Sequence, residues 1–167
     1  MAELSLEERL QPSLLDRLTD DEPKNTVEAR AHRVISINRL KSCVLRDLAW
    51  LLNCGSLSIT EDLEKYPEVQ RSVLNYGSAQ LSGKSVAAAE ISSLERRLRK
   101  VILDFEPRII PETLKVIVDA DREKMNNQAL TFRIEGQLWA QPLPVNLYLS
   151  TDIDLETGGA TVTETNG

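Results

Sequence analysis

The hydrophobic period of this chain changes once, near Pro111, and the change limits the folds open to it. Before Pro111, apolar residues recur every three or four positions, as they do on one face of an α-helix. After it, apolar and polar residues alternate, which is the pattern of a β-strand with one buried face. Helices followed by adjacent strands indicate an α+β class. We therefore expect two main amphipathic helices packed on a small antiparallel sheet, with a short N-terminal helix.

Two long helices are predicted ahead of Pro111. The first begins near Asn25, where Glu28 can complete a capping box, although fraying could move its effective start toward Arg30, and it ends at Gly55. The second runs over residues 85–105, because a proline at position 107 disfavours helical geometry in the residue before it. Both helices carry one apolar stripe, which they can bury against the sheet.

Three strands are predicted after Pro111. The stretch "LKVIV" gives the first, and the alternation in "LTFRIEGQL" and "VNLYLS" gives the other two, which we expect to form a hairpin. An isolated small sheet has open edges that can recruit another strand. An ordinary hairpin packed on two helices fits the spacing equally well. The last residues are acidic and poor in large apolar groups, so we expect residues 156–167 to form a flexible acidic tail.

The N-terminal stretch "PSLLDRLTDDEP" predicts a short helix with Leu14, Leu15 and Leu18 on one face. So short a helix is marginal alone in water, and its leucines must dock either on the rest of the fold or on a partner. The polar linker that follows favours a partner. We divide the chain into an assembly segment over residues 1–30, a domain over residues 31–155 and the tail over residues 156–167.

Composition and charge exclude several functional classes. The 167 residues are enough for one domain with its own core. The net charge of -6, without a basic block, disfavours nucleic acid as a partner. The N-terminus has charges where a signal peptide needs an apolar core, and no apolar run reaches the roughly 20 residues that span a bilayer. We expect a cytoplasmic protein without direct membrane insertion.

The sequence contains few residues that could bind a metal ion or a cofactor. Cys43 and Cys54 lie within one predicted helix, roughly 16 Å apart at about 1.5 Å per residue, which is too far for a disulfide. With His32 they make too few ligands for a zinc site. We expect two buried or inert thiols, no metal and no cofactor.

The triplet formed by Glu106, Pro107 and Arg108 places opposite charges beside an apolar run. Asp104 and Glu106 could be the two carboxylates of a glycoside hydrolase, but Arg108 would favour the ionised form of a residue that must act as an acid. Exposed loop charges are a second interpretation. A third is a partly buried pair, which gives orientation and partner discrimination more than stability. We expect no catalytic residue, and a muramidase-like glycoside hydrolase is the alternative.

Five stretches in order resemble one family. These are "LQPSLLDRLTDDEP", "VLRDLAWLLN", "YPEVQRSVLNYG", "FEPRIIPETLKV" and "FRIEGQLWAQPLPVNLYLSTDIDLETG". Over nearly the whole chain they are similar to the TssE family of type VI secretion baseplate subunits, which is related to the lysozyme-like wedge proteins of contractile phage baseplates. The resemblance implies a cytoplasmic, non-enzymatic component of the baseplate wedge at the inner membrane, which links the baseplate to the contractile sheath and templates sheath polymerisation.

The resemblance also implies partners and site residues. The expected partners are the wedge subunits TssF and TssG, with TssK in the same complex, and the sheath subunits TssB and TssC. The triplet would help to fix the strands where sheath and baseplate join. The N-terminal segment would be an assembly motif that binds partners. Its residues are Leu14, Leu15, Asp16, Arg17 and Leu18.

Overall fold

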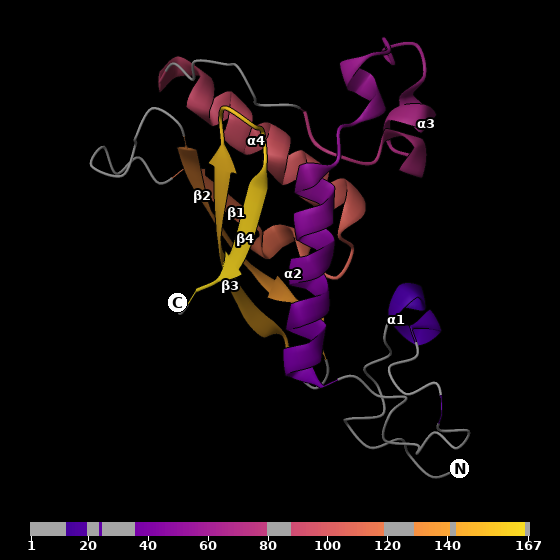
Figure 1. The fold of residues 1–167 in the computed structure, drawn as a ribbon, viewed down its shortest axis with the longest axis vertical. Helices are drawn as coiled ribbons and strands as arrows, with labels where there is room; N and C mark the ends of the chain where they lie inside the picture. The colour runs from indigo at the N-terminus through magenta and orange to yellow at the C-terminus, as the bar shows by residue number, and fades with distance from the viewer. Residues whose placement is uncertain are drawn as a thin grey trace.

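Two long helices cover one face of an antiparallel sheet (Figure 1). The computed structural model describes residues 13–19, 24, 36–79, 88–118, 129–140 and 143–165. Within them the sheet has four strands in the order β1-β2-β3-β4, so that each strand pairs with its neighbour in the sequence. The predicted α+β class, with two main helices and a short N-terminal one, is confirmed.

The helices agree with the predicted pattern but differ at one start. Helix α1 spans Leu14–Leu18, α2 spans Ile37–Asn53 and α4 spans Ala88–Phe105. The expected start of α2 near Asn25 lies outside the described residues. Ser36 has extended backbone geometry and accepts a hydrogen bond from the backbone N–H of Arg39 at 3.2 Å, which caps the helix there. None of the described helices has the length and apolarity that crossing a bilayer requires.

The strands include one that the sequence did not predict. The three expected strands are β1 (Lys115–Val118), β2 (Ala129–Leu138) and β3 (Val145–Asp154). The expected flexible tail is wrong over Ala160–Glu164, which form β4 and pair with the second half of β3. Val162 of β4 is buried, and an ion pair of 2.6 Å joins Lys41 of α2 to Glu164. Threonines on both sides of that valine suit a strand.

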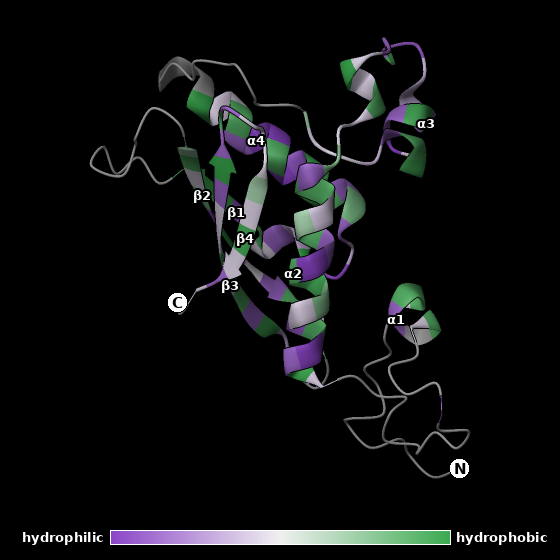
Figure 2. Cartoon of the chain, viewed as in Figure 1, coloured by the Kyte–Doolittle hydropathy of each residue, from purple (hydrophilic) through white to green (hydrophobic). Residues whose placement is uncertain are grey.

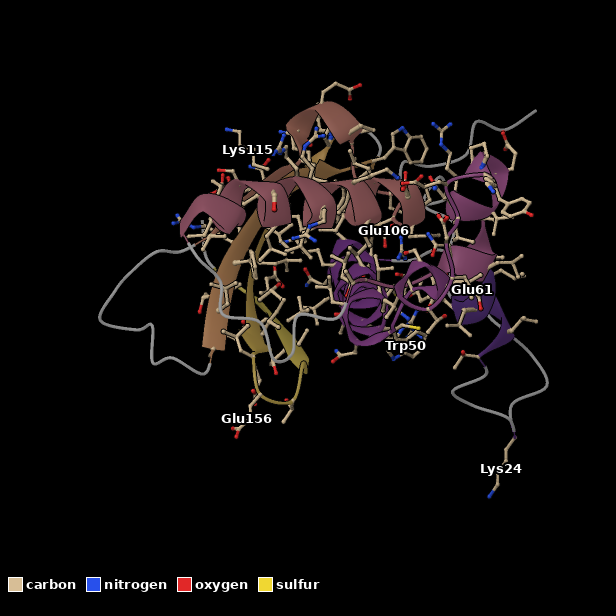
Figure 3. The ribbon with its side chains drawn as sticks, turned by 90° about the horizontal axis from the view of Figure 1, so that it is seen from above. Lys24, Trp50, Glu61, Glu106, Lys115 and Glu156 are labelled. Atoms are coloured by element: carbon tan, nitrogen blue, oxygen red, sulfur yellow. The ribbon has the colours of Figure 1, made fainter. Side chains whose placement is uncertain are left out.

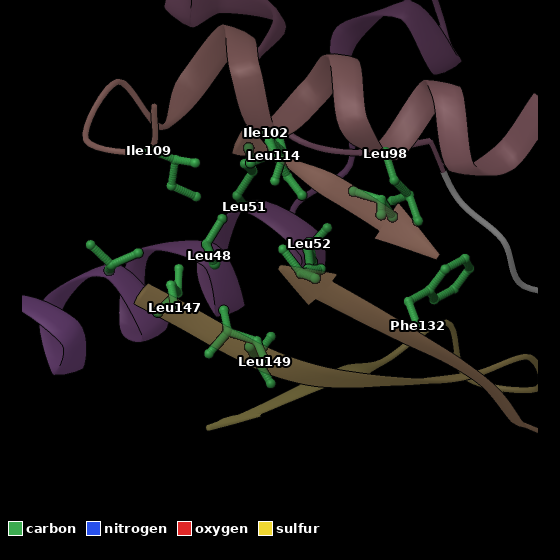
Figure 4. Packing of buried hydrophobic residues seen from close by; sticks show 14 of the residues in the cluster. Leu48, Leu51, Leu52, Leu98, Ile102, Ile109, Leu114, Phe132, Leu147 and Leu149 are labelled. Carbon is green, nitrogen blue, oxygen red and sulfur yellow. The ribbon is translucent and has the colours of Figure 1, made fainter. Parts of the chain in front are cut away.

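The core lies between the helices and the covered face of the sheet (Figure 4). Helix residues such as Leu48, Leu51 and Ile102 meet strand residues such as Phe132 and Leu149, all almost fully buried. The opposite face of the sheet is formed by the alternate, mostly polar residues of β2 and β3. Burial of this apolar area is the main stabilising contribution to a domain of this kind.

The connecting segment between α2 and α4 contains three short helices in its described part, which ends at residue 79. These are η3 (Leu57–Ile59), α3 (Pro67–Gln70) and η4 (Val73–Asn75), and Pro67 begins α3 as predicted. The segment returns to α2 through Gly77, whose φ of 126° favours glycine. A Cβ atom there would lie 2.4 Å from the carbonyl oxygen of Cys54, so the close approach also requires glycine. A further short helix, η5 (Pro111–Thr113), precedes β1.

Candidate functional site

The triplet forms a charged turn at the end of α4. Glu106 follows the last helical residue, and the chain reverses at Pro107 so that Arg108 folds back on the Glu106 side chain. The Arg108 Nε donates to Glu106 Oε1 at 2.7 Å, and Arg108 Nη2 donates to Glu106 Oε2. Figure 3 labels Glu106 beside the end of α4. Only 3% of this residue is exposed. The pair is therefore not a solvated loop pair, and the third interpretation of the sequence fits its burial.

The sheet fixes the position of this turn. The backbone N–H of Trp139 donates to the carbonyl oxygen of Arg108 at 2.7 Å, and the N–H of Ile110 donates to the carbonyl oxygen of Gln137 at 2.8 Å. Ile109 forms an isolated antiparallel bridge with Leu138 at the end of β2. These backbone bonds leave Arg108 little freedom to move relative to β2.

Helix α2 connects the triplet to the N-terminal helix. Arg108 Nη2 lies 2.6 Å from Asp47 Oδ2, and Arg46 Nη2 lies 2.8 Å from Asp47 Oδ1. Arg46 Nη1 in turn lies 2.7 Å from Asp16 Oδ1 in α1. Charges alternate along this chain of contacts. We call it the charged network, and its members are Asp16, Arg46, Asp47, Glu106 and Arg108.

The network holds its two arginines firmly in the charged form. Burial alone would lower the pKa of Arg108, but hydrogen bonds and the negative charges of Glu106 and Asp47 outweigh it and raise that pKa. The hydrogen bond to Asp16 is the main cause of a raised pKa at Arg46, which also stacks over the ring of Trp50 at 5.1 Å. Both guanidinium groups are therefore fixed positive charges at every pH at which the protein folds.

Helix α1 docks through its acid and turns its leucines outward. The side chain of Asp16 is 3% exposed and accepts a hydrogen bond from the Ser13 hydroxyl at 2.5 Å, in addition to its Arg46 contact. Leu14 and Leu18 are 71% and 74% exposed, and Leu15 is also exposed. Figure 2 shows this apolar colouring on the outside of α1. The side chain of Arg17 lies outside the described residues.

The lowered pKa of Asp16 predicts that the docking of α1 stabilises the protein in a pH-dependent way. Burial would raise this pKa, but the hydrogen bonds from Ser13 and Arg46 lower it from 3.8 to about 2. A lowered folded-state pKa gives stability that is present above pH 3.8 and is lost as the pH falls toward 2. We expect Asp16→Asn to lower the free energy of unfolding at pH 6 by about 2 kcal/mol.

Urea unfolding of both proteins from pH 6 to pH 2 measures this difference. The gap between wild type and Asp16→Asn should stay constant down to about pH 4 and close toward pH 2. Asp152→Asn is the control, since Asp152 is exposed and accepts a bond from Thr131. A gap that is unchanged at pH 2 would contradict the assignment of Asp16.

The site offers little for acid-base or metal chemistry. Both carboxylate oxygens of Glu106 accept hydrogen bonds from Arg108, and only 3% of the residue is exposed, which leaves this carboxylate little access to a substrate. Asp104 forms an i,i+4 ion pair with Lys100 on the helix surface. Within the described ranges, no three His, Cys, Asp or Glu side chains are grouped to hold a metal ion.

Polar helix side chains meet the outer edges of the sheet. Asn53 of α2 donates to the carbonyl oxygen of Ala160 at 2.7 Å and accepts from its N–H at 2.9 Å, so its amide stands where a further strand would pair with β4. At the other edge, Glu95 of α4 accepts from the N–H of Val118 and Arg99 donates to the carbonyl oxygen of Leu114. Such contacts protect an edge against unwanted pairing.

Neighbouring elements cover most of the two outer sides of the predicted hairpin. The strand β1 and the turn after α4 lie along β2, whereas β4 lies along only the second half of β3, from Leu149 to Ile153. The outer strands β1 and β4 are short, with four and five residues. The sequence missed this arrangement because it did not predict β4.

Sequence reasoning found the two ends of the charged network but not its middle. Glu106 and Arg108 are two residues apart, and the family resemblance placed Asp16 in the N-terminal assembly motif. Arg46 and Asp47 received no role, although "LRDL" puts two opposite charges between leucines of a helix that must bury one face. That local signal marks a charged pair at the border of a buried stripe.

Comparisons with known proteins give one family. A family model described as "Baseplate wedge protein gp25" matches residues 38–143. No curated protein matches the chain. A crystal structure from Geobacter sulfurreducens, which carries a provisional tail lysozyme label, is 14% identical and aligns over 70% of this chain and 94% of its own, with a TM-score of 0.46.

Proposed function

The chain belongs to the gp25 family of baseplate wedge proteins, and from this premise we propose that it is the TssE-type wedge subunit of a type VI secretion baseplate. In this role it is a non-enzymatic, cytoplasmic structural protein at a baseplate docked to the inner membrane. It links the wedge to the contractile sheath and gives the sheath its first template. Family membership itself supports a structural role in a phage-tail-like baseplate.

The charged network is the observation that carries the proposal. It joins the two motifs that the resemblance assigns to assembly, the N-terminal segment and the triplet, through Arg46 and Asp47 of one helix. Buried, hydrogen-bonded charges contribute orientation and partner discrimination rather than large net stability. A subunit that must place one partner relative to another needs that kind of rigidity.

The outward leucines of α1 support a wedge partner at the N-terminal segment. A helix of five residues is unstable alone, and here the contact of Asp16 with Arg46 holds it against α2. Because the helix is already ordered, little conformational entropy is lost when its exposed leucines bind an apolar groove on a partner. We assign this surface to the wedge subunits TssF and TssG, with TssK in the same complex.

The sheet is the proposed template for the sheath. Strand addition forms main-chain hydrogen bonds along an edge and reads side chains at alternate positions, which suits a polymer that grows by the same pairing. The sheath subunits TssB and TssC would then add strands at the outer edge of β4 or β1. Asn53 and Glu95 meet those edges in the lone subunit, and an added strand would displace them.

Substitution of Leu14, Leu15 and Leu18 by serine tests the N-terminal part of the proposal. We expect recovery of TssF and TssG in co-purification to fall about tenfold, since three exposed apolar contacts are lost. The melting temperature should change by less than about 2 °C, because these side chains are not in the core. Ile117→Ser, another exposed apolar position, is the control and should bind normally.

A stability loss with unchanged co-purification would contradict this assignment. That outcome would mean that the leucines dock on the rest of the fold and not on a partner.

A muramidase-like glycoside hydrolase remains the alternative function. Its motivation is the proximity of Asp104 and Glu106, and it requires one of them to act as a protonated acid near neutral pH. Both oxygens of the Glu106 carboxylate are instead engaged by hydrogen bonds from Arg108, and only 3% of the residue is exposed. Turnover of peptidoglycan by the purified protein, lost in Glu106→Gln, would favour the hydrolase over the structural role.

A further inference from the structure

Exposed apolar residues lie on the connecting segment, which the proposed function does not use. Val73 and Leu74 of η4 are 81% and 68% exposed, and Tyr66 before α3 is exposed as well. Figure 1 shows this segment standing clear of the sheet, and Figure 2 shows apolar residues among its polar ones. Large apolar side chains gathered on one short segment are typical of a protein-contact surface.

Hydrogen bonds hold this segment in one shape. The Asn75 side chain accepts from the backbone N–H of Ser58 at 2.9 Å and donates to the carbonyl oxygen of Gln70 at 3.0 Å. The Gln70 side chain donates to the carbonyl oxygen of Leu63, which is buried. Ser78 then joins the segment to the residues that follow α2: its N–H donates to the carbonyl oxygen of Cys54 at 2.8 Å, and its carbonyl oxygen accepts from the N–H of Ser56 at 3.2 Å. A fixed segment loses little conformational entropy when it binds.

Exposed acidic side chains outnumber exposed basic ones on the same segment. Four exposed acids lie between Leu57 and Asn75, against two exposed bases, Lys65 and Arg71. Within the described part of the chain no ion pair engages any of the four acids. They are Glu61, Asp62, Glu64 and Glu68. The segment therefore combines exposed apolar side chains with a net negative charge.

We propose that the segment from Leu57 to Asn75 docks a protein surface in which apolar side chains are flanked by lysine or arginine. Charge complementarity identifies this partner, since opposite charges on two surfaces steer association and discriminate against wrong partners. A second copy of the chain would bring the same acids to the contact. Nucleic acid and anionic membranes carry the same sign of charge as these acids. This surface is distinct from α1, from the charged network and from the sheet edges.

Photocrosslinking in the cell that makes the protein tests the proposal. The full chain carries p-benzoylphenylalanine at Val73, and a second version carries it at Glu156 in the exposed turn between β3 and β4. Mass spectrometry identifies the peptide joined to each position. We expect Val73 to join a peptide with more Lys and Arg than Asp and Glu, and Glu156 not to join that peptide.

Charge-reversal substitutions then test whether crosslinking depends on the acids of this segment or only on the net charge of the whole protein. Glu61→Lys with Glu68→Lys should lower the yield of the Val73 adduct about tenfold. Glu112→Lys with Glu156→Lys changes the net charge equally at exposed sites elsewhere and should leave the yield unchanged. The absence of an adduct at Val73, an acidic adduct peptide, or an equal response to both pairs of substitutions would overturn the proposal. None of these results bears on sheath assembly, which tests the proposed function separately.

Discussion

Substitution of Arg108 by methionine should lower the free energy of unfolding by about 3 kcal/mol. The reason is the burial of Glu106, whose side chain is 3% exposed and whose carboxylate accepts its side-chain hydrogen bonds from Arg108. Without Arg108 the carboxylate keeps the backbone N–H at position 108 and loses its positive partner. An unpaired buried charge is among the costliest defects in a folded protein. Urea unfolding followed by tryptophan fluorescence measures the change.

A matched pair on the same helix gives the control. Lys100 and Asp104 form an i,i+4 ion pair at the surface of α4, and Lys100→Met should cost less than about 0.5 kcal/mol. The double variant Glu106→Leu with Arg108→Met should recover to within about 1 kcal/mol of wild type, because it removes both charges together. Equal losses for Arg108→Met and Lys100→Met would mean that the triplet is no more than a surface pair.

The burial of Glu106 also changes how the function of the triplet can be tested. Reversal of either charge in a solvated pair leaves a folded monomer, whereas reversal at Glu106 places two positive groups together at a buried position. A loss of assembly in such a variant would not separate folding from function. The double variant does, since it keeps the apolar volume and removes the charges.

Hydrophobic period was sufficient to predict the two long helices and three of the strands. The alternation from Leu130 to Leu138 and from Val145 to Leu149 marks a sheet with one buried face, and the structure has β2 and β3 there. It was insufficient for β4, in which Val162 is the one large buried apolar residue. That strand depends on partners far away in the sequence, among them Asn53 and Lys41.

The site was predictable where its residues are neighbours in the sequence. The opposite charges of Glu106 and Arg108 are visible locally, but the contact between Asp47 and Arg108 joins residues 61 positions apart. The inward direction of Asp16 likewise depends on Arg46, 30 positions away. Periodicity gives the buried face of an element but does not give which charges meet when two elements pack.

Sheath formation in cells should fail in the double variant Glu106→Leu with Arg108→Met, even though the protein is folded. The substitutions remove the Arg108 guanidinium, which is partly exposed, and disconnect Asp47 from the turn that the sheet positions. Under the proposed function this change removes the electrostatic registration between the wedge and the sheath, and we expect at least about a tenfold decrease in sheaths per cell. The control is Lys100→Met with Asp104→Leu, which removes the exposed pair.

The count of extended sheaths per cell, made with a fluorescent sheath subunit, tests the central claim that the charged network is an assembly device. Cellular levels and melting temperatures of both double variants should be close to wild type. The account predicts few or no sheaths in the Glu106 and Arg108 double variant and a normal number in the Lys100 and Asp104 control. A normal number of sheaths in a folded Glu106 and Arg108 double variant would contradict it.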